Sequence, residues 1–120
     1  MMTYSETDYK VAAVSQLLNT LRPNAKWACA GYTYEGLQWI DEDQTKPTRA
    51  EWDAGFDDAV AAVKLSKLRI QRDIFITETD WWVLPDRTPT QEQLDYRQAL
   101  RDITDHYSSL DDVVWPEKPE

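Results

Sequence analysis

The chain has 120 residues and a formal net charge of −9 at pH 7, and 42% of its residues are hydrophobic. This length suits one domain, or one small module with an appendage, and the hydrophobic content suits a modest core. The negative charge argues against binding to nucleic-acid phosphates or to anionic membrane surfaces, because both attract a positive protein surface.

Other features of the composition narrow the possible class of protein further. Cys29 is the only cysteine, which excludes an internal disulfide and gives no sign of a secreted disulfide scaffold. We find no apolar run of about 20 residues and no charged-then-apolar leader, so the sequence predicts neither a transmembrane span nor a signal peptide. Six Trp and six Tyr are many for this length and favour a thin core or an exposed contact patch.

A helix is predicted near the start of the chain. Ser5 or Thr7 can cap it, and we expect it to run from about Asp8 to Arg22, just before Pro23. Apolar residues three and four positions apart give this helix one apolar face, which consists of Val11, Val14, Leu17, Leu18 and Leu21.

Two short segments after this helix predict a β-hairpin. They are Lys26–Gly31 and Leu37–Asp41, and turn-forming residues occupy positions 32–36 between them. A two-stranded hairpin is not stable by itself, so the amphipathic helix should cover it. Residues 1–47 are therefore predicted to form a small α-β-β module.

The next predicted element is a long helix from Thr48 to about Thr79. Thr48 and Glu51 form a capping box, in which each side chain binds the other residue's backbone N–H. We expect residues 48–63 to complete the N-terminal module by packing one apolar stripe on the hairpin. That stripe consists of Trp52, Phe56, Val60 and Val63.

Residues 64–120 predict an antiparallel αα-hairpin and a polar tail. A loop from Leu84 to Pro89 leads to a helix from about Gln91 to His106, which Thr90 and Gln93 cap. The chain is therefore predicted to be an α+β protein. The N-terminal helix and β-hairpin pack on the long central helix, and a C-terminal αα-hairpin follows. The stripe of the last helix is Tyr96, Leu100, Ile103 and Tyr107.

No residue pattern predicts catalysis, a cofactor site or a metal site. The acidic loop after residue 41 begins like a calcium-binding loop, but Lys46 and Trp52 occupy the places of the required Gly and bidentate Glu. His106 is the only histidine, and its place at a helix C-terminus indicates a surface residue. Cys29 is interpreted as a small buried hydrophobe. We therefore expect no enzyme and no catalytic, cofactor-binding or metal-binding residues.

Trp81 and Trp82 allow two interpretations. In the first, the pair is a hot spot for a protein partner, because Trp is enriched among such anchors. In the second, the pair closes the end of the αα-hairpin against Tyr96, Leu100 and Trp115. Both hold if one indole faces inward and the other outward. A weaker option is a sugar-stacking platform, which would suit an enzyme that acts on cell-surface sugars.

A basic belt lies along the second half of the long helix. It consists of Lys64, Lys67, Arg69 and Arg72, with no acidic residue between positions 61 and 72. The belt is interpreted as a solvated helix face. The more specific alternative is that it contacts an acidic surface of a partner.

Four motifs between residues 69 and 116 resemble the tail assembly chaperone family of tailed bacteriophages. A helix ending in ETDWWVL (78–84) is preceded by RxxRD (69–73) and followed by a loop with Pro. The segments YRQALRDIT (96–104) and VVWP (113–116) come next, in the family's order. Residues 74–76 (IFI) depart from the family, since polar helix formers are expected there, and they indicate a larger buried or partner-facing surface.

The N-terminal part is similar to a second phage module, the XkdW-like proteins. The similarity lies in LRPNA (21–25), WID (39–41) and QTKPT (44–48). It spans about 45 residues.

Together, the resemblances imply an accessory protein of phage tail or tail-fibre morphogenesis without catalysis. It would bind a structural tail or tail-fibre protein in the host cell cytoplasm and shield it through the C-terminal helices. A structural component that stays in the virion tail is the alternative, and pairing with a second copy is also left open. The expected partner-binding residues are Trp81, Trp82, Leu84, Tyr96, Leu100, Ile103 and Trp115.

Overall fold

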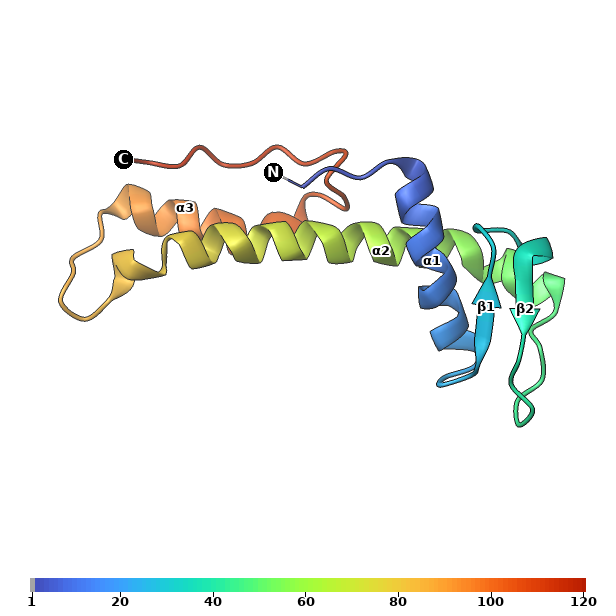
Figure 1. Ribbon diagram of the computed structural model, residues 1–120. Helices are drawn as coiled ribbons and strands as arrows, with labels where there is room; N and C mark the ends of the chain where they lie inside the picture. The colour runs from blue at the N-terminus through green and yellow to red at the C-terminus, as the bar shows by residue number, and fades with distance from the viewer. Residues whose placement is uncertain (1) are drawn as a thin grey trace. The chain divides into compact units, whose positions relative to one another are not determined.

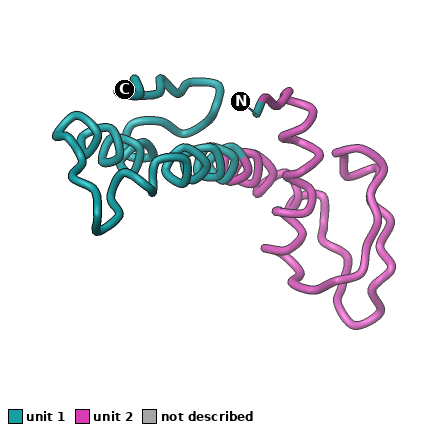
Figure 2. Tube along the Cα trace, turned by 60° about the vertical axis from the view of Figure 1, so that its left-hand side comes forward, with its two compact units in different colours: residues 1–2, 64–120 teal, residues 3–63 magenta. Residues whose placement is uncertain are grey.

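The computed structural model describes residues 2–120, and the predicted α+β fold is confirmed: three α-helices accompany a two-stranded antiparallel hairpin (Figure 1). The chain divides into two compact units, Thr3–Val63 and Lys64–Glu120 together with Met2 (Figure 2). The division falls inside α2 (Arg49–Glu78), so this helix contributes residues to both units. None of the helices in the described region is long and apolar enough to cross a membrane.

Helix α1 (Glu6–Leu21) begins at a capping box formed by Ser5 and Asp8. The Asp8 N–H donates to Ser5 Oγ at 3.1 Å, and the Ser5 N–H donates to Asp8 Oδ2 at 2.8 Å. The predicted face is wrong at Val11, which is 49% exposed, whereas Tyr9 is buried. Burying the larger ring removes more apolar area from water, so the buried face turns toward Tyr9. Its buried residues are Tyr9, Ala13, Val14, Leu17 and Leu18.

The hairpin is shorter than predicted, with strands β1 (Trp27–Cys29) and β2 (Leu37–Trp39). The antiparallel register places Trp27 opposite Trp39 and Cys29 opposite Leu37. Strand β1 ends early because Gly31 has a φ of 75° and a 3-10 turn, η1 (Tyr34–Gly36), occupies the connection to β2. Leu37 is buried in the unit core, and the other strand residues on its face pack against that core.

The first half of α2 supplies the aromatic centre of this unit. Trp52 stacks on Phe56 with ring centres 5.8 Å apart, and Tyr34 meets Trp52 edge-on at 5.8 Å. Of the predicted stripe, Trp52 and Val63 are buried, while Phe56 and Val60 are half-buried against the same core. The stripe and Leu37 of β2 therefore belong to one hydrophobic core.

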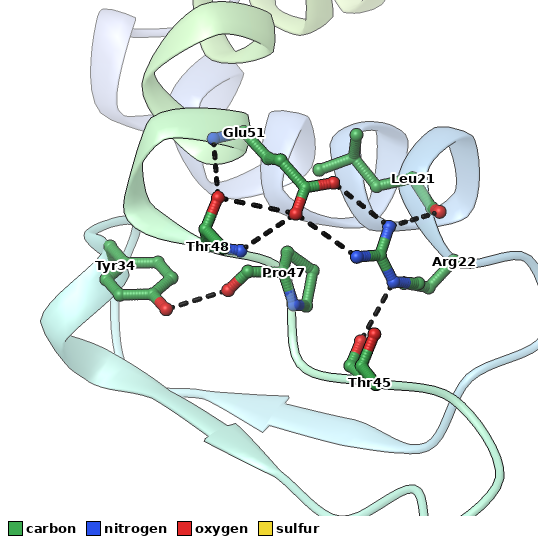
Figure 3. Close-up of polar contacts among 7 residues, drawn as sticks. All are labelled: Leu21, Arg22, Tyr34, Thr45, Pro47, Thr48 and Glu51. Carbon is green, nitrogen blue, oxygen red and sulfur yellow. Dashed lines mark hydrogen bonds and ion pairs between the residues drawn. The ribbon is translucent and has the colours of Figure 1, made fainter.

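A polar cluster ties the end of α1 to the start of α2 (Figure 3). Arg22 donates from Nε to the Thr45 carbonyl at 2.8 Å and from Nη1 to the Leu21 carbonyl at 2.9 Å. Its two terminal nitrogens also reach both carboxylate oxygens of Glu51, at 3.1 and 3.2 Å. The same carboxylate accepts the Thr48 N–H at 3.1 Å, as the predicted capping box requires. One carboxylate thus caps α2 and holds α1.

In the other unit, α3 (Gln91–Arg101) begins at the predicted capping box of Thr90 and Gln93. The helix was expected to reach His106, but it ends at Arg101. A 3-10 turn, η3 (Ile103–Asp105), follows it. The tighter turn leaves Ile103 buried, at 4% exposure.

We expect Gly36→Ala to destabilise the hairpin by about 3 kcal/mol, the upper end of over-packing costs, because an added Cβ would overlap the backbone carbonyl oxygen of Ala30. Gly31→Ala is the matched control: its φ is positive, but nothing lies within 4 Å of an added Cβ. It should cost only about 1 kcal/mol. Denaturant unfolding followed by circular dichroism measures both, and equal losses would contradict the steric argument.

The Glu51 carboxylate should make stability depend on pH. Its hydrogen bond from the Thr48 backbone, and then the one from Arg22, lower its pKa from the ordinary value of 4.5. A lowered pKa means that the contribution is present above the unfolded-state pKa and is lost as the pH falls through the folded-state pKa. The difference in melting temperature between wild type and Glu51→Gln should therefore shrink between pH 7 and pH values below 4.5. A constant difference would show that the charge of Glu51 does not contribute.

Candidate functional site

The C-terminal unit has its own aromatic core. Trp82, Tyr96 and Leu100 are buried together, and Phe75 and Ile76 of α2 pack against them. The Trp82 and Tyr96 ring centres are 6.0 Å apart. Burial, together with the nearby charge of Glu78, raises the pKa of Tyr96, so its hydroxyl stays protonated at neutral pH.

The two adjacent tryptophans point in different directions. They lie in a 3-10 turn, η2 (Asp80–Val83), which follows α2 directly. Trp82 is 4% exposed, whereas Trp81 is 49% exposed, and their rings are inclined by 71°. The guanidinium of Arg87 lies 4.4 Å from the centre of the Trp81 ring, within cation–π distance. One indole therefore belongs to the core and the other to the surface.

Arg97 is a buried charged residue that the sequence reasoning did not single out. Its Nη1 donates to the Ile76 carbonyl at 3.0 Å and to Thr79 Oγ1 at 2.7 Å, and its Nη2 meets Asp80 Oδ1 at 3.1 Å. Arg97 is 7% exposed and Thr79 is fully buried. The guanidinium thus joins the end of α2 and the start of η2 to α3. Helical periodicity gave no signal for its burial, because Arg97 lies beside the stripe residue Tyr96 and not on the stripe.

The residues expected to bind a partner fall into two groups. Trp81 and Leu84 are exposed, at 49% and 50%. Val83, which lies between Trp82 and Leu84, is also exposed, and the sequence did not predict this. The remaining members lie inside the unit: Trp82, Tyr96, Leu100 and Ile103 are buried and Trp115 is half-buried. Of these, Trp82, Tyr96, Leu100 and Trp115 share one cluster.

The C-terminal segment has no regular secondary structure after η3. The Asp112 carboxylate accepts the N–H groups of Ser108 and Ser109, and Lys64 pairs with Asp111 at 3.7 Å. Trp115 then meets Phe75 edge-on, with ring centres 4.8 Å apart. The Trp115 Nε1–H is buried and finds no hydrogen-bond acceptor in the part of the chain that the structure describes. An unsatisfied donor of this kind costs about 1–3 kcal/mol.

Asp41 and Cys29, two groups considered in the sequence, have shifted pKa values with structural causes. The Asp41 carboxylate accepts the backbone N–H groups of Lys26, Asp43 and Gln44, and these bonds lower its pKa. Burial raises the pKa of Cys29, which keeps it as a thiol. Within residues 2–120 no group of three or more potential metal ligands comes together.

The basic belt is partly engaged within its own unit. Lys64 pairs with Asp111, and Arg72 Nε meets Asp73 Oδ1 at 3.0 Å. Arg69 is exposed. The belt is therefore not a uniform bare cationic face.

Comparison with known proteins gives a match for this unit. The family model described as phage tail assembly chaperone protein matches residues 65–120, which confirms the resemblance of the C-terminal half and includes all four motifs. The match indicates a role in phage tail assembly for this region. It does not reach residues 1–64, so the similarity to XkdW-like proteins stays a prediction. No curated protein and no solved structure matches the chain.

Removing the Arg97 side chain should destabilise the C-terminal unit. Arg97→Ala leaves the Ile76 carbonyl, Thr79 and Asp80 without this charged donor, which should lower the free energy of unfolding by about 1.5–3 kcal/mol. Arg101→Ala on the same helix removes an exposed arginine whose side chain donates hydrogen bonds to Gln98, so it should have little effect. Urea unfolding of the two variants measures the difference. Similar stabilities would contradict the importance of this cluster.

Proposed function

We propose that the chain is a non-enzymatic assembly protein of phage tails or tail fibres, which binds a structural tail protein and shields an apolar segment of it during morphogenesis. The observation that carries this proposal is the match of residues 65–120 to phage tail assembly chaperone proteins. The matched segment coincides almost fully with the unit Lys64–Glu120, so the match covers a part of the chain with a core of its own.

The tip of this unit supports a contact with another protein. Trp81, Val83 and Leu84 are consecutive or nearly so in the chain, and each is more than 40% exposed. Exposed tryptophan supplies large contact area at a low cost in side-chain entropy. In the proposed site, Trp81 and Leu84 contact the partner, while the inner residues hold the tip in place. These inner residues are Trp82, Tyr96, Leu100, Ile103 and Trp115.

The net charge fits this role. A chain with a charge of −9 repels copies of itself and keeps a complex with an aggregation-prone partner dispersed. The proposed place of action is the host cell cytoplasm, where tail proteins are assembled. Release before maturation is the leading form of the proposal, and retention in the virion tail is the alternative.

The test is co-expression with the neighbouring phage tail proteins, followed by pull-down on a tag at the N-terminus. Trp81→Ala should weaken capture of the tail partner about tenfold or more, because an anchor residue at a contact commonly contributes at least 2 kcal/mol. Val11→Ala is the matched control, since Val11 is also 49% exposed but lies in the other unit. Undiminished capture of the tail partner by the Trp81→Ala variant would contradict the proposal that Trp81 contacts the partner.

A protein inventory of purified virions separates the two forms of the proposal. If the chain is a transient chaperone, mature particles should contain none of it, or far less than one copy for each partner chain. Stoichiometric presence would contradict release and support a structural component.

A further inference from the structure

The last eight residues form a strap, defined here as residues 113–120, which is held by few contacts. In Figure 1 it is the extended red segment that runs back along α3. No backbone–backbone hydrogen bond among the described residues involves the strap, and it has no helix or strand. Segments with so few backbone bonds open at low free-energy cost.

Two side chains anchor the strap to the rest of its unit. Trp115 lies against Phe75, and Lys118 Nζ lies 4.0 Å from Glu78 Oε2 and 5.9 Å from the centre of the Trp82 ring. The first anchor is imperfect because the buried Trp115 Nε1–H has no acceptor. The second is weak because both charged groups are about half exposed and screened by water.

Beyond these anchors, the strap fits α3 poorly. A cleft of about 650 Å³ has residues of both elements in its lining, among them Tyr96 and Ala99 of α3. The lining also includes Glu92 and Asp95 of α3 and Glu117 and Glu120 of the strap. The only cation in the lining is Lys118, whose described contacts are with Glu78 and Trp82. Carboxylates of α3 and of the strap thus line the same unfilled cleft, where their like charges repel.

We propose that the strap is a replaceable occupant of a partner-binding groove on α2 and α3. The groove takes an extended segment of the tail protein that has an aromatic residue for the place of Trp115 and basic residues for the places of Glu117 and Glu120. The strap shows the shape and the aromatic anchor that the groove accepts, and its acidic residues show how it is mismatched. A basic segment complements Glu92 and Asp95 and displaces the strap. This inference rests on the proposed function and names the chemistry of the partner.

Labelled synthetic peptides test the groove with the full chain. One peptide has the native sequence of residues 111–120, and a second carries Glu117→Lys and Glu120→Lys. A third adds Trp115→Ala to the second. Fluorescence anisotropy measures their binding to the wild-type chain, to a Trp115→Ala chain with a loosened strap, and to a Val114→Ala chain. Val114→Ala is the matched control because Val114 is in the strap but 69% exposed.

The basic peptide should bind the Trp115→Ala chain about tenfold more tightly than the wild-type or Val114→Ala chain, since the competing strap is weakened. It should also bind about tenfold more tightly than the native acidic peptide, and high salt should reduce this difference. The peptide without tryptophan should not bind. If Trp115→Ala unfolds the chain, Lys118→Ala can replace it, because it loosens the strap without removing an aromatic ring. The basic peptide should then bind the Lys118→Ala chain more tightly than the wild-type chain.

Several results would overturn the proposal. Equal binding to the wild-type and loosened chains would show that the strap does not compete, and binding without the peptide tryptophan would show simple charge attraction. A wild-type dimer that becomes a monomer in the Trp115→Ala chain would assign the groove to the strap of a second copy. These results do not depend on the pull-down: a captured tail protein with no peptide binding refutes only the groove. Peptide binding with no captured tail protein refutes only the assembly role.

Discussion

A single helix cannot shield its own apolar side from water, and this constraint organises both units around α2, a helix of 30 residues. In the first unit α1 and the hairpin cover Trp52 and Val63. In the second unit η2, α3 and the C-terminal strap cover Phe75 and Ile76. Each unit is therefore incomplete without its share of α2, although each has a core of its own.

The core of the C-terminal unit is stabilised by a charged side chain as well as by apolar contacts. Arg97 binds a carbonyl, a hydroxyl and a carboxylate at the point where α2 gives way to η2. Two motifs of the family resemblance, the one ending in ETDWWVL and the one beginning with YR, meet in this cluster. Their pairing has a physical basis, because Thr79 and Asp80 of one motif accept hydrogen bonds from the arginine of the other.

Local signals in the sequence predicted the elements well, and long-range packing decided the rest. The capping boxes at Thr48 and Thr90 are confirmed, since they depend on residues only three positions apart. The exposure of Val11 was missed because it depends on which face of α1 meets distant parts of the unit. The end of α3 at Arg101 was missed because no Gly or Pro marks it in the sequence. Adjacent positions in a turn give no periodicity, so the sequence could not assign Trp81 and Trp82 to surface and core.

The contact between Arg87 and Trp81 affects how the free chain behaves at high concentration. The Arg87 guanidinium lies over one face of the exposed indole, 4.4 Å from its centre. Two copies that met through their tips would bring two such cations together, whereas a surface that offers a carboxylate would be attracted. The positive charge beside the exposed indole would therefore disfavour tip-to-tip pairing of two copies and favour a surface that offers a carboxylate.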